Sequence, residues 1–274
     1  MRSLALAENL PRYVAADTAD DFERERLELL ARLMNPMTAS RLERIGVGPG
    51  WRCLEVGAGN GSVARLLAER VGPSGRVVAT DLNPRFLGEL RPCEVEVRRH
   101  DILHDDLESD HYDLVHCRAV LMHLADPERA LARMAAALRP GGWLFIEEGD
   151  LGPFTAANLA HPAALWFNQI HGSARETVRA LGLVDCYFGR RCDGLLERLG
   201  LVELEGETTT WLCRGGGLGA RFQQMNLELM SGLLGSALLP EAENQALQRL
   251  YDDPSFAFVH MAMVGAWGRR ARTP

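Results

Sequence analysis

Three glycines and one acid are the residues whose types and spacing indicate chemistry. Gly57, Gly59 and Gly61 follow a short apolar run, and Asp81 closes a second one. Glycine permits tight turns in which the backbone approaches a ligand closely. A carboxylate after the second strand can accept hydrogen bonds from both hydroxyls of a ribose. The pattern therefore predicts an adenosine-type cofactor at the end of the first strand of a parallel sheet.

The elements that must position these residues are two strands and a helix. Residues 53–56 and 77–80 are short, mainly apolar runs of the kind that form buried strands. Val63, Leu66 and Leu67 repeat with helical spacing, so we expect a helix that begins at the glycine turn. A strand, a glycine turn, a helix and a second strand in this order indicate an α/β fold.

The position of the third glycine distinguishes between cofactors. A dinucleotide fingerprint would place that glycine at position 62, which is a serine, and an acid, Glu55, precedes the turn. The run Glu-x-Gly-x-Gly-x-Gly resembles motif I of the class I S-adenosylmethionine (SAM) methyltransferases. SAM has no pyrophosphate but carries an ammonium and a sulfonium, so acids near the turn suit it. An ordinary strand-turn-helix with a chance glycine cluster is the alternative, and Asp81 in register argues against it.

The resemblance continues over about residues 51–150. Residues 77–84 are similar to motif II, which has a strand, the ribose acid and a helix opened by proline. Residues 95–102 and 112–118 resemble the third and fourth strands, and 138–146 resemble the helix-turn-strand signature L-x-P-G-G-x-L. The resemblance implies that Asp101 bonds the adenine amino group, that Ile102 packs on the ring, and that the fourth strand ends under the methionine half of SAM.

The resemblance also implies a set of cofactor-binding residues. SAM is the expected cofactor, and the expected contacts are Tyr13, Met37, Glu55, Gly57, Ala58, Gly59, Asn60, Asp81, Leu82, Asn83, Asp101, Ile102, Cys117 and Arg118. Packing against the sheet is an equally good explanation for Tyr13 and Met37.

The fold class we expect is α/β: a doubly wound, seven-stranded, mostly parallel Rossmann-like sheet with N-terminal helices. A helical cap is expected after strand 5 and before strand 7. We expect helices at 20–34 and 36–45, broken at Asn35-Pro36, and a strand at 201–205 that residues 208–212 extend past a turn at Gly206. The last strand is expected at 256–267, antiparallel between strands 5 and 6. The predicted segments are a leader (1–50), the SAM-binding core (51–150), a lid (151–191) and a remainder (192–274) with a second cap element (about 217–251).

Composition narrows the function class. The formal net charge of -7 argues against a dedicated nucleic-acid binder, whose surface is basic. No apolar run is long enough to span a membrane, no signal peptide is evident, and the six cysteines lack metal-ligand spacing. We therefore expect a bacterial, cytoplasmic protein with reduced thiols and no bound metal, present as a monomer or homodimer. Glu147, Glu148 and Asp150 hold a small residual chance of a metal site.

The acceptor and the base are less constrained. A hydroxyl acceptor needs a base, and the candidates are His104, His116, His123, His171 and Tyr187, of which we select His123 and His171 as catalytic. Trp166, Phe167, His171 and Tyr187 are the expected substrate-binding residues.

The favoured function is methyl transfer to O, N or C of a small, aromatic or hydrophobic metabolite in secondary metabolism. A SAM-binding enzyme of the same fold that catalyses a non-methylating cyclisation or rearrangement is the alternative. A macromolecular methyltransferase or non-catalytic partner protein ranks third, and a nicotinamide oxidoreductase is disfavoured by Ser62.

Overall fold

The computed structural model describes residues 18–88, 90 and 95–272. The chain forms two compact units. As far as they are described, unit 1 consists of Met1–Leu33, Asp150–Tyr187 and Thr210–Ala262, and unit 2 consists of Met34–Gly149, Phe188–Thr209 and Met263–Pro274. Each unit is therefore built from three separate stretches of sequence.

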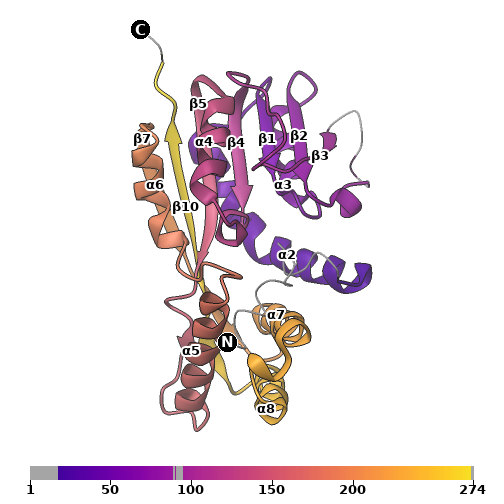
Figure 1. Ribbon diagram of the computed structural model, residues 1–274, viewed down its shortest axis with the longest axis vertical. Coiled ribbons are helices and arrows are strands. Elements are labelled where there is room, and N and C mark those ends of the chain that lie inside the picture. Colours follow the sequence, from indigo (N-terminus) through magenta and orange to yellow (C-terminus); the bar gives the residue numbers. More distant parts are fainter. Residues whose placement is uncertain (1–17, 89, 91–94, 273–274) are drawn as a thin grey trace. The chain divides into compact units, whose positions relative to one another are not determined.

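A seven-stranded sheet is the centre of unit 2. Figure 1 shows its strands side by side, from β7 at the left edge to β3 at the right edge. The strand order is β3-β2-β1-β4-β5-β10-β7, and β10 pairs with β7 antiparallel. This confirms the predicted Rossmann-like sheet, including its antiparallel last strand between strands 5 and 6. In chain order the strands are β1 (Arg52–Val56), β2 (Arg76–Asp81), β3 (Val95–Arg99), β4 (Tyr112–Arg118), β5 (Leu138–Asp150), β7 (Val202–Thr209) and β10 (Ala262–Arg269).

Helices on the sheet begin and end at residues that favour those positions. Helix α3 (Ser62–Val71) begins after Gly61 and ends at Gly72, both with positive φ. Helix α4 (Pro127–Ala137) has proline at its first position, and the Asp126 carboxylate accepts a hydrogen bond from the Arg129 N–H at 3.0 Å. Helix α6 (Cys192–Arg198) follows a short 3-10 helix, η3 (Gly189–Arg191). A further 3-10 turn, η1 (Pro84–Phe86), opens with Pro84 where a helix was predicted.

One face of the sheet holds the main apolar cluster of unit 2. Its members come from β1, β2, β3, β4, β5 and β10, from α3, from the C-terminal half of helix α2 (Asp20–Ile45) and from loops. Burial of apolar surface contributes about 25 cal/mol of stabilisation per Å² and is the dominant favourable term in such packing. Buried side chains of this cluster include Leu42, Ile45, Cys53, Val63, Leu67, Val77, Leu114, Phe145 and Trp267.

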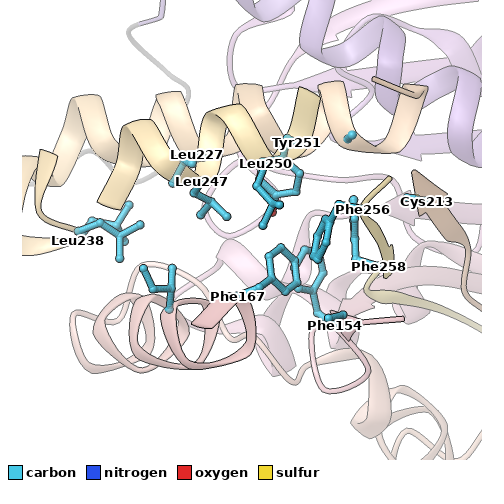
Figure 2. Packing of buried hydrophobic residues seen from close by; sticks show 14 of the residues in the cluster. Phe154, Phe167, Cys213, Leu227, Leu238, Leu247, Leu250, Tyr251, Phe256 and Phe258 are labelled. Carbon is cyan, nitrogen blue, oxygen red and sulfur yellow. The ribbon is translucent and has the colours of Figure 1, made fainter. Parts of the chain in front are cut away.

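Unit 1 has its own core, rich in aromatic side chains. A small antiparallel sheet, β6-β9-β8, combines β6 (Thr155–Ala156), β8 (Leu212–Arg214) and β9 (Ala257–Val259). Its helices are α5 (Ala164–Ala180), α7 (Leu218–Leu234), α8 (Glu241–Asp252) and the N-terminal part of α2, and the 3-10 helix η4 (Gly235–Ala237) lies between α7 and α8. Figure 2 shows Phe154, Phe167, Phe256 and Phe258 gathered beside leucines of α7 and α8.

The predicted break between two N-terminal helices is wrong. Helix α2 does not break at Asn35-Pro36 but continues through Pro36. Both sides of Pro36 are held by packing: Leu29 belongs to a cluster with Phe222 and Met225 of unit 1, and Leu42 belongs to the main cluster of unit 2. Proline removes one helical hydrogen bond and clashes with the preceding turn, and tertiary packing outweighs that cost here.

The predicted strand 256–267 is also wrong as a single element. The chain forms two strands, β9 in the small sheet and β10 in the large one, with His260 and Met261 between them. Likewise Gly206 lies inside β7 rather than in a turn, and Leu212 belongs to β8 of the small sheet. Apolar periodicity detects extended chain but does not tell to which sheet a strand belongs.

Candidate functional site

The glycine turn after β1 has a backbone that other residues rarely adopt. Gly57, Gly59 and Gly61 have φ angles of 69°, 57° and 73°. A Cβ atom at Gly57 would lie 2.4 Å from the Cγ2 atom of Val120. Glycine is therefore required at Gly57 for its conformation and for the space around it.

Asp81 lies at the end of β2, beside this turn. Strands β1 and β2 are parallel neighbours, so the turn and the acid emerge at the same edge of the sheet. The Asp81 carboxylate accepts hydrogen bonds from the N–H groups of Gly59 and Asn83, both at 2.9 Å. The predicted pair of motifs therefore meets in space, and a carboxylate beside a glycine turn fits the ribose of an adenosine cofactor.

The loop after β3 lies beside the end of β2. The His100 N–H donates to the Asp81 carbonyl at 2.9 Å. Next along the chain, the Asp101 carboxylate accepts from the Leu103 N–H at 2.9 Å and lies 2.8 Å from His104 Nδ1. The neighbouring Ile102 is buried, whereas Leu82 is 46% exposed. An exposed leucine beside an acid suits a face that a planar ring would cover.

A buried polar network lies on one face of the sheet at the carboxyl ends of β1, β4 and β5. Glu55 pairs in register with His116 across β1 and β4, and Arg118 pairs with Glu147 across β4 and β5. The two ring nitrogens of His116 each contact a carboxylate: Nδ1 lies 2.6 Å from Glu55, and Nε2 lies 3.2 Å from Glu147. Since Glu55, His116 and Glu147 are almost completely buried, their charges act on one another with little screening.

Side chains of helix α2 complete this network by bonding residues of β4 and β5. Arg41 donates to Glu147 at 2.6 Å, and the Thr38 hydroxyl donates to the same carboxylate at 2.5 Å. Arg118 donates to the Thr38 hydroxyl at 2.9 Å and to the Asn35 side-chain oxygen at 3.0 Å. The guanidinium of Arg118 is thus already engaged by α2, and Met37 lies buried on the same helix.

Electrostatics in the network follow from burial and pairing. Burial alone would lower the pKa of His116, but the charges of and hydrogen bonds to Glu55 and Glu147 outweigh it and raise that pKa to about 9. Burial alone would raise the pKa of Glu147, but His116, Arg118 and Arg41 hold it at about 2. Burial raises the pKa of Glu55, although His116 opposes the shift. His116 therefore favours its protonated form between the two acids and is not a free general base.

Cys117 and Glu148 point to the opposite face of the same strands. The Glu148 carboxylate accepts from the N–H groups of Val120, Leu121 and Met122 at 3.0, 2.8 and 3.3 Å. It thereby holds the loop after β4, where the 3-10 helix η2 (Leu121–His123) carries the candidate base His123. Burial raises the pKa of Glu148 to about 7, although these N–H groups oppose the shift.

The predicted substrate-binding residues belong to unit 1. Phe167 is fully buried, and Trp166 and Tyr187 pack at the margin of the same core. His171 lies against Phe154 and Phe167, with its Nε2 atom 2.8 Å from the Tyr251 hydroxyl. Burial and the charge of Arg175 lower the pKa of His171 to about 3. A role as base would require the Tyr251 hydroxyl to leave that nitrogen first.

The predicted cofactor residues that the structure describes and the predicted substrate residues belong to different units. All described cofactor candidates lie in unit 2, and Tyr13 lies outside the described residues. Sequence reasoning missed the roles of Asn35, Thr38, Arg41 and Ser62 in the polar network, and it considered Glu147 only as a metal ligand. The available signal was the presence of His116 and Glu147 in otherwise apolar strands.

Absences can be stated for the described part of the chain. Within it, no helix is long and apolar enough to cross a membrane. Among the same residues, no group of three or more His, Cys, Asp or Glu side chains is arranged to hold a metal ion.

Comparison with known proteins gives a family. Residues 7–202 match the model of a methyltransferase domain. Methyltransferase str2 of Strobilurus tenacellus is 32% identical over 133 residues, which are 48% of this chain and 48% of that protein. The ubiquinone/menaquinone biosynthesis C-methyltransferase UbiE of Bordetella parapertussis is 34% identical over 140 residues, 47% of this chain and 51% of that protein. The chain thus spans about half the length of these curated relatives.

Solved structures support the fold. Phosphoethanolamine N-methyltransferase 2 of Haemonchus contortus, in complex with phosphomonomethylethanolamine and S-adenosylhomocysteine, is 18% identical with a TM-score of 0.52. The similarity covers 85% of this chain and 51% of that one. At this identity the similarity concerns the fold.

Proposed function

The chain belongs to the SAM-dependent methyltransferases, as the methyltransferase domain over residues 7–202 shows, and we propose that it transfers a methyl group from SAM to a small molecule. The observation that supports this most is the 2.9 Å hydrogen bond from the Gly59 N–H to the Asp81 carboxylate. It joins the glycine turn to the ribose-type acid at one edge of the sheet.

We propose that unit 2 binds SAM around this contact. Asp81 would accept the ribose hydroxyls, since each carboxylate oxygen has more than one lone pair. Leu82 and Ile102 would pack on the adenine, and Asp101 would accept from its amino group. Gly57, Ala58, Gly59, Asn60, Asn83, Met37 and Cys117 would line the rest of the site.

We propose that the acceptor is apolar and planar, and that residues 151–191 and about 217–251 supply its contacts. Aromatic and aliphatic side chains dominate unit 1, to which these segments mostly belong. The similarity to a ubiquinone/menaquinone biosynthesis C-methyltransferase makes a quinone or phenol ring the first class to test, with O and N as further acceptor atoms. The described cysteines are buried thiols, which fits a reducing compartment, and we propose that the reaction takes place in the cytoplasm.

The chemistry asks little of the protein besides alignment. SAM carries its methyl group on a positively charged sulfur. When the methyl group is transferred, this sulfur leaves as a neutral thioether, which is a good leaving group. The protein's residues hold donor and acceptor in line, and such positioning can remove about 7–11 kcal/mol from a barrier. Where the acceptor is a hydroxyl, His123, which ends η2 after β4, is the residue we propose as base.

Calorimetry with SAM, followed by assay of S-adenosylhomocysteine release with a panel of phenols and quinones, tests the function. We expect SAM to bind, and S-adenosylhomocysteine to form together with one methylated acceptor. Absence of SAM binding would sink the proposal. A converted acceptor without S-adenosylhomocysteine would instead indicate a cyclisation or rearrangement.

The placement of SAM has its own test in Asp81→Ala. Loss of hydrogen bonds between a carboxylate and the ribose should weaken SAM binding by roughly 1.5–3 kcal/mol. Calorimetry measures the affinity, and Asp113→Ala, on β4 where the Asp113 side chain accepts from the Arg52 N–H, is the control acid of the same unit. Equal affinities of the Asp81 variant and the wild type would contradict the placement.

A further inference from the structure

Both ends of the glycine turn are attached to the buried polar network. Glu55 stands two residues before Gly57 and is held by His116 at 2.6 Å. Ser62 follows Gly61 directly and is the first residue of α3. Its hydroxyl lies 3.2 Å from the Arg118 guanidinium and 3.3 Å from the Asn35 side-chain oxygen. The turn between Glu55 and Ser62 is therefore fixed at two points to the same set of side chains.

Arg118 is the residue that joins the two halves of this network. It donates to Ser62 and Asn35 on one side and to the Thr38 hydroxyl on the other, and Thr38 in turn donates to Glu147. Arg118 is only 9% exposed and its contacts are all inside unit 2. The guanidinium presents two nitrogens in a fixed plane, one bonded to Thr38 and the other to Asn35 and Ser62, whereas a lysine presents a single nitrogen.

Stability alone does not explain such an arrangement. Burying charges is costly, and a buried ionic network is often no more stabilising than apolar side chains of the same volume. The surrounding face of the sheet is apolar, so apolar residues would fit it. The network does provide rigid geometry. A functional site requires such rigidity from the residues that support its ligand-binding groups.

We propose that Arg118, acting through Ser62 and Asn35, is a positioning residue for the SAM site, and that Glu55, held by His116, which Glu147 holds in turn, positions the other end of the turn. Neither side chain needs to touch SAM for this role. The glycine turn has the correct shape because Arg118 fixes the start of α3 while Glu55 fixes the end of β1. The inference rests on the SAM placement proposed above.

The hydroxyl of Ser62 allows a sharp test. Ser62→Ala removes the contact to Arg118 with little change in volume, whereas Ser62→Thr retains a hydroxyl. We expect the SAM dissociation constant, measured by calorimetry, to rise about tenfold in Ser62→Ala, equivalent to about 1.4 kcal/mol. In Ser62→Thr it should return to within about twofold of the wild type. Arg118→Lys should weaken SAM binding as Ser62→Ala does, because a single ammonium nitrogen cannot occupy the positions of both guanidinium nitrogens.

A matched control separates positioning from stability. Tyr112 is buried on the same strand as Arg118, and its hydroxyl donates to Glu108 at 3.0 Å, away from the turn. Tyr112→Phe should lower the free energy of unfolding in urea and leave SAM affinity unchanged. If Ser62→Ala behaves like Tyr112→Phe, losing stability but not affinity, or if Ser62→Thr fails to restore affinity, the positioning role is overturned.

Asp81→Ala, measured in the same series, distinguishes the two possible failures. If Asp81→Ala weakens SAM but Ser62→Ala and Arg118→Lys do not, the SAM placement holds and the positioning inference fails. If Asp81→Ala leaves SAM affinity unchanged, the placement itself fails.

Discussion

Gly57 combines two constraints that can be separated by mutation. Its φ of +69° disfavours any other residue, and a Cβ atom would meet Val120 at 2.4 Å. Gly72, at the end of α3, has a φ of +61° but nothing within 4 Å of the added Cβ. With a ψ of -170°, Gly72 lies in a region that is nearly restricted to glycine and that costs of order 1–3 kcal/mol for other residues.

Gly72→Ala should therefore lose about 1–3 kcal/mol of unfolding free energy from backbone strain alone and keep its SAM affinity. Gly57→Ala should lose more, because Val120 and the loop after β4 must move, and it should bind SAM weakly. Urea unfolding and calorimetry on both variants measure the difference. Equal losses of stability with intact SAM binding in both would show that the contact with Val120 is unimportant.

His116 makes stability depend on pH at the alkaline side of neutrality. Its folded pKa of about 9 lies above the unfolded value of about 6.5, so its contribution is fully present below about pH 6.5 and is lost as pH rises through about 9. We expect the free energy of unfolding in urea to fall over that window. In His116→Gln the fall should be smaller, because the group that releases a proton is gone.

The comparison between wild type and His116→Gln isolates this residue from others. Buried thiols such as Cys53, whose pKa is raised by burial, also favour a fall at alkaline pH, but they are present in both proteins. Parallel pH profiles of the two proteins would mean that the imidazolium is not the form that the carboxylates stabilise.

At the scale of elements, the local motifs were predictable and the contacts between distant segments were not. Strands β1, β2 and β4 and helix α3 occur where spacing and periodicity indicated, because each is specified by a few consecutive residues. Asn35, Thr38 and Arg41 meet Arg118 and Glu147 only because α2 crosses that face of the sheet. No local pattern carries that information.

Helix α2 shows the reverse error, in which a local rule was trusted too far. Asn35-Pro36 is a strong breaker pair, and yet the helix runs from Asp20 to Ile45. Asn35 bonds Arg118 and Thr38 bonds Glu147, so the turn around Pro36 is fixed from outside the helix. Contacts of this kind override propensity, and they coincide here with the candidate site.

Glu148 sets the position of η2 and so provides a test at this scale. Its carboxylate accepts three backbone hydrogen bonds from residues 120–122. Glu148→Ala leaves these buried donors without an acceptor, each costing about 1–3 kcal/mol. Glu148→Gln retains a carbonyl oxygen and should keep most of the stability. Urea unfolding at neutral pH measures both.

The acid form of Glu148 adds a pH signature to the same experiment. Its folded pKa of about 7 lies above the ordinary value of 4.5, so its contribution is present below about pH 4.5 and is lost as pH rises through about 7. The glutamine variant should lack this part of the fall. If Glu148→Ala is as stable as Glu148→Gln, the carboxylate does not hold the loop.

On the scale of the whole molecule, the chain divides its candidate residues between two units. The described cofactor candidates are all in unit 2, and the candidate acceptor residues Trp166, Phe167, His171 and Tyr187 are all in unit 1. The units are interleaved in sequence, and helix α2 contributes to both, with the boundary between Leu33 and Met34. Binding of SAM and binding of the acceptor should therefore protect different segments of the chain from hydrogen exchange.

Amide hydrogen exchange with mass spectrometry can detect this protection. SAM should slow exchange at residues 57–62, 81–83 and 101–103, because local opening of these loops would break contacts to the cofactor. Helices α7 and α8 should exchange at the same rate with and without SAM. Addition of an acceptor that supports turnover should then slow exchange in residues 151–191. Protection of α7 and α8 by SAM alone, as strong as that of the glycine turn, would contradict the assignment of the cofactor to unit 2 alone. Asp81→Ala serves as the control, since a cofactor that no longer binds cannot protect either unit.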